Sequence, residues 1–416
     1  MSKKVIIVGG GAAGLMAALF AARAGAKVLL LEQNEKLGKK IYITGKGRGN
    51  LTNAVDMQAF MAHIYRNPRF LYPAFANLDN QGAMRLFEEL GLPLKVERGE
   101  RVFPASDHAS DITAALKRAL DRAGVETRLN TRVQGLYVAE ERCAGVLVEN
   151  GSCIAADAVV LATGGLSYPS TGATGDGYRF AQDAGHRLVE TAPSLVPIVT
   201  KESWPAMLMG LSLRNVRLTA TAVVKGKAKK LFSEQGEMLF THFGISGPLV
   251  LTLSEVLPND PCGISLAIDL KPAVDETTLN ARMLREFQLA QNKRIVSVME
   301  NYAPKALAKQ ITVLAGVPEG LPVHSVTAKQ RAELIAMMKR IPLTVQARRG
   351  YEEAIITRGG VDVRDINPST MESRRMKDLY FAGEMMDVDA TTGGFNLQIA
   401  FSTGALAGKS AGMETV

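Results

Sequence analysis

Residues 3–32, which read KKVIIVGGGAAGLMAALFAARAGAKVLLLE, constrain the fold of this chain more than any other stretch. The apolar run 5–8 predicts a short buried strand, and the spacing GxGxxG that begins at Gly9 then opens a helix. A second apolar run, 27–31, predicts the next parallel strand, and Glu32 follows it about twenty residues beyond the glycines. This order of strand, glycines, helix, strand and acid predicts a unit that binds a dinucleotide.

Each residue of the motif has a physical role. Gly9 permits a tight turn, Gly11 lets backbone approach a pyrophosphate because it lacks a Cβ, and Gly14 lets the helix lie close to the strand. The helix start offers unpaired N–H groups and a positive dipole end to the phosphates. Glu32 can accept both ribose hydroxyls of an adenosine, and its charge disfavours the 2′-phosphate of NADP. The alternative, a secretory signal, needs neither the spaced glycines nor the strand that ends in an acid.

Composition excludes several other classes of protein. The chain has 416 residues, which suggests two or three domains, and its 47% hydrophobic and 22% charged residues are those of a soluble globular protein. No apolar run reaches the length of about 18 residues needed to span a bilayer. The three cysteines form no CxxC pair, and the five histidines have no metal-ligand spacing. We therefore expect a cytoplasmic protein without a metal site, a membrane partner or disulfide-exchange chemistry; the oligomeric state stays open.

The formal net charge of +8 is consistent with nucleic acid or with an anionic cofactor. Basic residues cluster at 39–48, 225–230 and 374–377, and only the first cluster lies among glycines. There, KLGKKIYITGKGRGNLTN can turn its N–H groups inward and place cations such as Arg48 beside Asn50 over a phosphate. The alternative is a flexible basic surface loop. The other clusters are typical of solvated faces, so charge alone does not lead us to expect a nucleic-acid partner.

The middle of the first domain predicts helices followed by short strands. Residues 56–125 have a mostly helical pattern, with 101–104 as a loop. Short strands are expected at 126–133, 136–138, 144–148 and 153–155. An apolar strand then enters Ala-Thr-Gly, which after such a meander is typical of flavoproteins with two dinucleotide folds. We therefore expect Thr163 and Gly164 to lie at the cofactor.

The carboxyl end returns to this domain and favours FAD over NAD. The strand LYFAGE ends in Gly383 and Glu384, whose carboxylate can accept a ribityl hydroxyl. The sequence TTGGFNLQ then opens a final helix, expected at 397–407, with Gly394 at its start. The N–H groups at this end can face the pyrimidine carbonyl of an isoalloxazine and stabilise negative charge on the reduced ring.

Residues from about 193 to 343 differ in character and suggest an insertion. The runs 212–224 and 263–270 alternate like half-exposed strands, whereas 276–339 has a mostly helical pattern. Within MLFTHFGISGP, His242 is a candidate proton donor or carbonyl polariser. The alternative of equal weight is a histidine that caps the next helix or satisfies loop carbonyls.

With these motifs, the chain resembles the bacterial FAD-dependent oxidoreductases of the YhiN, BaiN and aminoacetone oxidase type over essentially its whole length. The resemblance rests on GGGAAG, KLGKKIYITGKGRGNLTN, ATGGLSYPSTGATGDGY, MLFTHFGISGP and the segment from GGVDV to FNLQIAFSTG. It implies an α/β fold: a glutathione-reductase-like FAD-binding domain, with a Rossmann-type parallel sheet and a β-meander, carrying an inserted small β-barrel and a helical subdomain. The expected bounds are 1–192 with 345–416, then 193–275 and 276–344. One departure is Gly49, which stands where the family has a cysteine.

The resemblance also implies cofactor contacts and an activity. The implied FAD contacts are Ala13, Glu32, Lys39, Lys40, Thr44, Gly45, Val133, Glu384, Asn396, Leu397 and Gln398. The activity is hydride transfer between FAD and a small organic substrate, as an ene-ketone reductase or an amino-ketone or amine oxidase. Because the chain has one GxGxxG, NAD(P)H would have to bind transiently, or oxygen would close the cycle. The alternatives are an FAD-dependent RNA-modifying enzyme and a flavin-binding protein with little catalysis.

Overall fold

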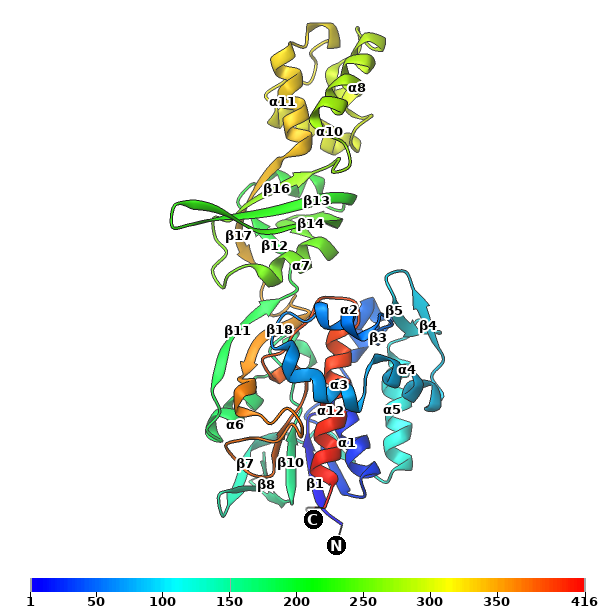
Figure 1. Cartoon of the computed structure of the whole chain (residues 1–416), viewed down its shortest axis with the longest axis vertical. Helices are drawn as coiled ribbons and strands as arrows, with labels where there is room; N and C mark the ends of the chain where they lie inside the picture. Colours follow the sequence, from blue (N-terminus) through cyan, green and yellow to red (C-terminus); the bar gives the residue numbers. More distant parts are fainter. Residues whose placement is uncertain (1, 150, 415–416) are drawn as a thin grey trace. The chain divides into compact units, whose positions relative to one another are not determined.

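The computed structural model describes residues 2–149 and 151–414, and the chain divides into two compact units. The first unit comprises Met1–Pro193 and Tyr351–Val416, and the second comprises Ser194–Gly350 (Figure 1). The first unit is therefore assembled from both ends of the chain, and the second is inserted into it.

A parallel sheet forms the centre of the first unit. Its strand order is β19 (Leu379–Phe381), β10 (Ala158–Leu161), β1 (Lys4–Val8), β2 (Lys27–Leu31) and β6 (Glu126–Arg128). Every neighbouring pair in this order is parallel. The central strand is fully buried at Ile6 and Ile7, which explains its continuous apolar run. The predicted dinucleotide-binding unit, with α1 (Ala12–Arg23) between β1 and β2, is confirmed in its elements.

The helix α12 (Phe395–Gly412) packs along α1 in the same direction (Figure 1). A Cβ added at Gly404 would lie 2.2 Å from the Ala13 carbonyl oxygen, and one at Gly408 would lie 2.1 Å from that of Ala17. Small residues on both helices thus set their register. Because Gly404 lies against Ala13, Thr403 is level with Ala12, the first residue of α1. Helix α12 starts eight residues before Thr403, so its N-terminus extends about 12 Å beyond the N-terminus of α1. This helix is longer at both ends than the 397–407 expected from the sequence.

The expected meander is present, but its first strand is divided. The antiparallel sheet consists of β7 (Val133–Ala139), β8 (Arg142–Val148) and β9 (Cys153–Ala155). The segment expected as one strand, 126–133, contains β6 of the parallel sheet, then a turn, then the start of β7. Asn130 has a φ of 50° in this turn, a left-handed conformation that an extended strand cannot contain.

The segment after the basic loop contains helices and a small sheet. The helices are α2 (Met57–Ala62), α3 (Tyr72–Asn77), α4 (Asn80–Glu89) and α5 (Ser110–Arg122). The sheet has the order β3 (Thr52–Asn53), β5 (Arg101–Pro104) and β4 (Leu94–Glu97). The loop expected at 101–104 is therefore wrong, because Val102 and Phe103 are buried and their strand pairs with two others. The remaining elements are α6 (Asp176–Asp183) and the paired strands β11 (Leu188–Ser194) and β18 (Ile356–Val361).

The second unit is a closed barrel with a helical extension (Figure 1). The strand order is β12 (Ile198–Thr200), β15 (Gly244–Ser246), β14 (Lys227–Thr241), β13 (Ser212–Val224), β16 (Ser265–Asp269) and β17 (Ile341–Arg348). Its helices are α7 (Pro248–Val256), α8 (Glu276–Leu289), α9 (Ile295–Met299), α10 (Lys305–Leu314) and α11 (Ala328–Lys339). The boundary expected at residue 344 falls inside β17, because the strand that closes the barrel follows the helices in the chain. Barrel and helices share one hydrophobic core.

Over residues 2–149 and 151–414, none of the helices combines the length and the apolar character that crossing a membrane requires.

Candidate cofactor-binding site

Glu32 lies where the GxGxxG motif predicts an acidic residue, at the carboxyl end of β2, and is 7% exposed. Its Oε2 accepts a 2.7 Å hydrogen bond from the Gly10 N–H, and its Oε1 accepts 2.8 Å and 2.6 Å bonds from the N–H and Nδ2 of Asn34. These bonds fix the carboxylate next to the glycine turn. The Thr131 N–H also donates to the Glu32 carbonyl, which brings the start of β7 at Val133 to this strand end.

The three glycines of the GxGxxG motif, Gly9, Gly11 and Gly14, differ in what surrounds them. A Cβ at Gly14 would lie 1.8 Å from the Gly9 carbonyl oxygen, and Gly9 itself has a φ of +103°. By contrast, no heavy atom lies within 4 Å of a Cβ built at Gly11, which is the residue before α1 and provides no side-chain cap. A side chain at Gly9 or Gly14 would therefore disturb the packing of the protein itself, whereas Gly11 faces open space before an uncapped helix start. That arrangement suits an anion at the helix N-terminus.

A polar cluster joins the basic loop that contains Lys40 to Glu384, which follows β19. The Lys40 ammonium lies 2.6 Å from Glu384 Oε2 and donates a 2.6 Å hydrogen bond to Ser167 Oγ. Ser167 Oγ donates to Glu384 Oε1, and the Thr357 N–H donates to the same oxygen over 2.8 Å. Ser167 and Thr357 could not be predicted as partners of Glu384, because nothing local in the sequence links them to it.

Two more predicted residues lie at strand ends beside this cluster. Gly164 follows β10, has a φ of +75° and has no heavy atom within 4 Å of its Cβ position. Gly383 follows β19, and its Cβ would lie 2.7 Å from the Cβ of Ala13. Thr163 packs closely against Gly177 of α6, because a Cβ at Gly177 would lie 1.9 Å from the Thr163 Oγ1. Carboxyl ends of adjacent parallel strands thus meet at the start of α1.

The basic loop contains both cofactor candidates and structural residues. Arg48 bonds Glu97 and Asp107, and its guanidinium stacks over Phe103 at 4.4 Å from the ring centroid. Hydrogen bonds to Glu97 and then Asp107 raise the pKa of Arg48. Its charge is therefore already paired within the protein. Lys39 ion-pairs with Glu35 at 3.0 Å.

The turn inside that loop and the start of α12 lie near each other. Thr44 is extended and Gly45 has a φ of 57°, which reverses the chain within the 3₁₀ segment Ile41–Gly47. After this turn, the Asn50 amide, in the orientation that satisfies its neighbours, accepts a 3.0 Å hydrogen bond from the Gly394 N–H. Gly394 precedes α12 with a φ of +100°, and its Cβ would lie 2.3 Å from the Thr52 carbonyl oxygen.

The side chains at the start of α12 are mostly used within the protein. Asn396 bonds both the N–H and the carbonyl of Ala390, which closes the loop before the helix. Gln398 is 0% exposed and bonds Thr52, Ser402 and the Leu78 carbonyl. Leu397 is half-buried. Because the side chains of Asn396 and Gln398 are hydrogen-bonded within the protein, these two residues can contact a ligand through their backbone.

His63, which was not among the predicted site residues, also lies at the start of α12. Its ring stacks on Phe395 with centroids 4.3 Å apart, and its Nδ1 lies 3.1 Å from Thr391 Oγ1. The Thr391 N–H donates to the His63 carbonyl. This histidine is 328 residues from Thr391 along the chain, so sequence spacing could not have identified it.

His242 belongs to the second unit and lies in the exposed turn between β14 and β15. Its ring meets Phe243 edge-on at 4.9 Å, and the Arg349 guanidinium covers the same phenyl ring at 4.6 Å. Its role as a proton donor stays a prediction.

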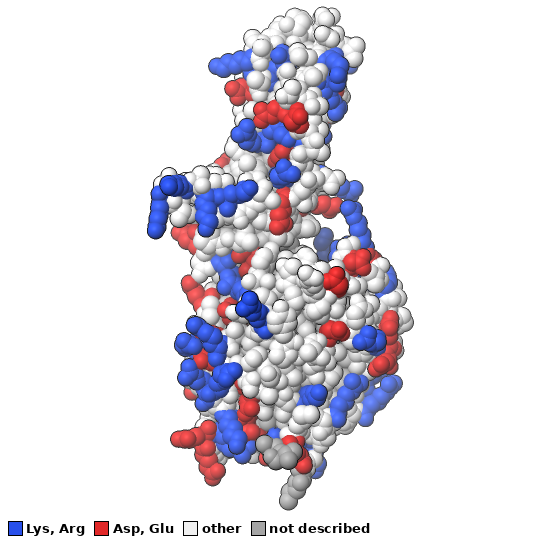
Figure 2. Space-filling model, in the orientation of Figure 1, with Lys and Arg blue, Asp and Glu red and all other residues white. Residues whose placement is uncertain are grey.

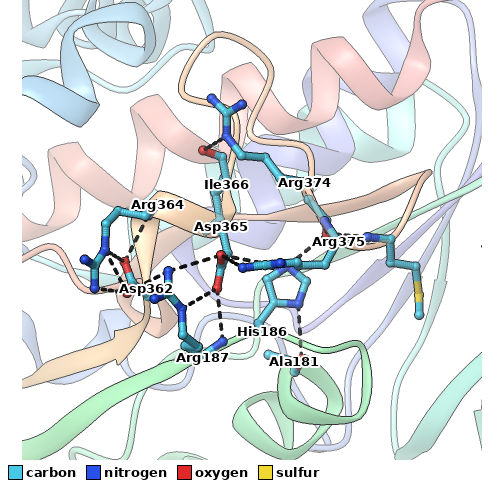
Figure 3. Close-up of polar contacts among 11 residues, drawn as sticks. Ala181, His186, Arg187, Asp362, Arg364, Asp365, Ile366, Arg374 and Arg375 are labelled. Carbon is cyan, nitrogen blue, oxygen red and sulfur yellow. Dashed lines mark hydrogen bonds and ion pairs between the residues drawn. The ribbon is translucent and has the colours of Figure 1, made fainter.

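A second charged cluster ties α6 and β11 to the loop that follows β18 (Figure 3). Asp365 is 2% exposed and accepts from the Arg187 N–H and from the guanidinium groups of Arg187 and Arg375. Burial alone would raise the pKa of Asp365, but these donors outweigh it and lower the pKa to about 2. Beside it, the buried His186 bonds the Ala181 carbonyl and Ser373. The close-up shows these groups pointing toward one another, which indicates a structural tie between elements.

The residues at the carboxyl edge of the parallel sheet fit FAD. The Glu32 carboxylate accepts a hydrogen bond from the glycine turn, and the uncapped start of α1 faces open space. The start of α12 lies about 12 Å beyond the start of α1, measured along the parallel helices. The first two features suit an adenosine and a pyrophosphate, and the third suits the far end of an extended cofactor.

Comparisons with known proteins agree with this arrangement. The family model described as "HI0933-like protein Rossmann domain" matches residues 3–410. The chain is 31% identical over 414 residues to the 3-dehydro-bile acid delta(4,6)-reductase of Clostridium scindens, with 98% of each chain covered. It is 31% identical over 399 residues to the ribosomal RNA dihydrouridine synthase of Escherichia coli (strain K12), covering 96% of this chain and 95% of that relative.

Among solved structures, the 3-ketosteroid-delta4-(5alpha)-dehydrogenase from Rhodococcus jostii RHA1 aligns with a TM-score of 0.54 at 16% identity. The alignment covers 99% of this chain and 97% of that one, and at such identity it shows the fold alone. The family match and the relatives over nearly the whole length are decisive. This chain belongs to the HI0933-like family of FAD-dependent oxidoreductases.

Proposed function

We propose that this enzyme reduces a carbon–carbon double bond conjugated to a carbonyl group. The observation that carries the proposal is that the names of two relatives, both aligned over nearly the whole chain, describe such a reduction. One is a delta(4,6)-reductase of a 3-dehydro-bile acid, and the other makes dihydrouridine, in which a ring double bond beside a carbonyl is saturated. The reaction adds one hydride and one proton across the bond. Bound FAD would supply the hydride, with NAD(P)H as the proposed source of electrons.

The residues at the sheet edge are proposed to hold FAD. Glu32 would accept the adenosine ribose hydroxyls, and the N–H groups after Gly11 would bind the pyrophosphate. Lys40 and Glu384, already paired at 2.6 Å, would hold the ribityl chain. The other proposed contacts are Gly9, Ala13, Gly14, Lys39, Thr44, Gly45, Arg48, Asn50, Val133, Thr163, Gly164, Gly383, Gly394, Asn396, Leu397 and Gln398.

The start of α12 is proposed to face the reacting end of the cofactor. The dipole of this 18-residue helix is positive there, which favours negative charge on a reduced ring. We assign the proton that the substrate needs to His63, because its imidazole contacts Thr391 and Phe395 at this helix start. His242 is the alternative donor.

Two classes of substrate meet this description. The first is a free small molecule with a conjugated ene-ketone, which the bile-acid reductase supports. The second is a uracil ring within RNA, which the dihydrouridine synthases of Escherichia coli and Haemophilus influenzae support; each is 31% identical to this chain. In both cases the bond reduced and the demand for one proton are the same.

The test is anaerobic stopped-flow spectroscopy of the FAD-loaded protein. NADH or NADPH should bleach the oxidised flavin band, and a steroid with a conjugated ene-ketone or a uridine-containing RNA should restore it. Product mass would show a gain of two hydrogens. Bleaching by an amine or amino-ketone, with NAD(P)H inert and oxygen as the acceptor, would instead establish an oxidase and overturn the proposal.

A further inference from the structure

Strands β13 and β14 continue beyond the barrel as a two-stranded arm, residues 222–230. β13 pairs with β16 only from Arg217 to Thr221, whereas its pairing with β14 continues to Val224 opposite Lys227. On the other side, β14 pairs with β15 only at its far end, from Leu239 to Thr241. In the arm, therefore, each strand has the other as its sheet partner.

The arm is strongly basic. It carries Lys225, Lys227, Lys229 and Lys230, all of them exposed, and Figure 2 shows blue side chains gathered over this hairpin. From 203 to 233 the chain has six basic residues, with Arg214 and Arg217 on β13, and no Asp or Glu. Within the described part of the chain, none of the four lysines has a carboxylate within 4.0 Å. Among the described residues, therefore, no carboxylate pairs with the positive charge of the arm.

The lysines are distributed over both faces of the ribbon. Lys229 stands opposite Ala222, and Lys230, the next residue, stands opposite Thr221 and so projects to the other face. Lys225 and Gly226 form the connecting turn, with φ values of 51° and 73°. Protection against edge-to-edge aggregation requires charge only along the exposed strand edges. Cations on both faces and at the turn exceed that need and match a ligand with negative charge on two sides.

We propose that the arm binds the phosphate backbone of RNA. A two-stranded ribbon with lysines on both faces can lie between phosphate chains, where each ammonium acts as a point charge that holds position without reading sequence. The exposed large apolar residues of the arm are Val223 and Val224, and the arm has no aromatic side chain, so its apolar surface is too small for insertion into a lipid bilayer. This inference rests on the RNA candidate in the proposed function and names the surface that would anchor that substrate.

The test uses the full FAD-loaded chain and a fluorescent RNA stem–loop with uridines in its loop. The variant changes Lys225, Lys227, Lys229 and Lys230 to Gln. The matched control changes four exposed lysines of the helical part, Lys293, Lys305, Lys309 and Lys329, to Gln, which removes the same charge. Binding is measured by anisotropy between about 50 and about 200 mM KCl.

The arm variant should bind RNA at least about tenfold more weakly, and the slope of log affinity against log salt should fall by about 2–3, near 0.7 for each lost phosphate contact. The control should keep the parent slope. Equal losses in both variants, or no RNA binding by the parent, would overturn the inference. So would selective loss of binding to phosphatidylglycerol vesicles, which would instead indicate a membrane surface.

The two proposals fail in distinguishable ways. Flavin bleaching by NAD(P)H and its recovery with a free ene-ketone report on the reductase, and the arm variant should retain both. If the arm binds RNA but the flavin accepts no hydride from NAD(P)H, the RNA-binding proposal is supported and the reductase proposal is wrong.

Discussion

The Lys40 ammonium lies 2.6 Å from the Glu384 carboxylate, although 344 residues separate them in the chain. Lys40 comes from the loop after the first dinucleotide unit, and Glu384 follows the last strand of the sheet. Their contact joins the beginning and the end of the first unit at the place where we propose that FAD binds.

The first prediction concerns this pair. Glu384→Gln leaves Lys40 without its anion and weakens the bond from the Thr357 N–H, and a hydrogen bond to a charged group contributes about 1.5–3 kcal/mol. We expect FAD affinity to fall at least about tenfold, measured by titration of the flavin-free protein. Lys309→Met, which breaks the exposed Lys309–Glu319 pair, is the control and should leave the FAD affinity unchanged. Unchanged flavin affinity in Glu384→Gln would remove Glu384 from the site.

The second prediction separates cofactor binding from folding at one glycine. Gly11 has a φ of −82°, which alanine adopts freely, and its Cβ would meet no atom within 4 Å. Gly11→Ala should therefore fold as stably as the parent without FAD, yet bind FAD about 10–100-fold more weakly because the methyl group blocks the phosphates. Gly14→Ala provides the contrast, since its Cβ would lie 1.8 Å from the Gly9 carbonyl oxygen and should destabilise the unit itself. A Gly11→Ala protein that retains full flavin content would contradict the pyrophosphate assignment.

The third prediction concerns the contact between α1 and α12. Gly408→Ala would place a methyl group 2.1 Å from the Ala17 carbonyl oxygen, so the helices must separate. We expect a loss of about 1–3 kcal/mol in the stability of the first unit, seen as a lower melting temperature by circular dichroism. Gly135→Ala is the control in the same unit, because its Cβ has an ordinary 3.8 Å contact with Leu147. Equal melting of both variants would show that the helices do not depend on this close approach.

The fourth prediction concerns acid stability. The pKa of Asp365 is lowered to about 2 despite burial, because Arg187 and Arg375 hydrogen-bond its carboxylate. A carboxyl whose folded pKa is depressed adds stability above its unfolded pKa, and this contribution is lost as pH falls from about 4 to about 2. Arg187 and Arg375 are about half exposed, so solvent screens part of their interaction with Asp365. Asp365→Asn should therefore lower the free energy of unfolding by about 1–2 kcal/mol at neutral pH. It should also flatten the loss of stability between pH about 4 and about 2.

The control for this change is Asp183→Asn. Asp183 is 64% exposed and lies 3.8 Å from Arg179, so its removal should leave both the neutral-pH stability and the acid slope as they were. An Asp365→Asn protein with the parent's acid slope would refute the assignment of this carboxyl.

The fifth prediction tests His63. His63→Gln should leave flavin reduction by NAD(P)H intact and slow the return of the oxidised band with an ene-ketone by about 10²-fold or more, as expected for a lost general acid. The same change at His242 is the comparison. If His242→Gln slows the second step and His63→Gln does not, the proton donor lies in the second unit.

What the sequence by itself determined is local. The GxGxxG spacing, the apolar runs beside it and Glu32 together predict a strand, turn, helix and strand, because each depends on backbone conformations encoded within a few residues. Predictions were wrong where local signals were weak. Residues 101–104, expected as a loop, form a strand because two other strands pair with them.

What only the tertiary structure decided is which distant side chains meet. Ser167 and Thr357 bind Glu384, His63 meets Thr391, and Gly408 fits against Ala17 across separations that leave no periodic trace in the sequence. The glycine-rich loop predicts Arg48 as a phosphate ligand, and only the fold shows that Glu97 and Asp107 also hydrogen-bond its guanidinium. Local patterns fix the elements because their hydrogen bonds are local, whereas partners are chosen by packing, which depends on the whole chain.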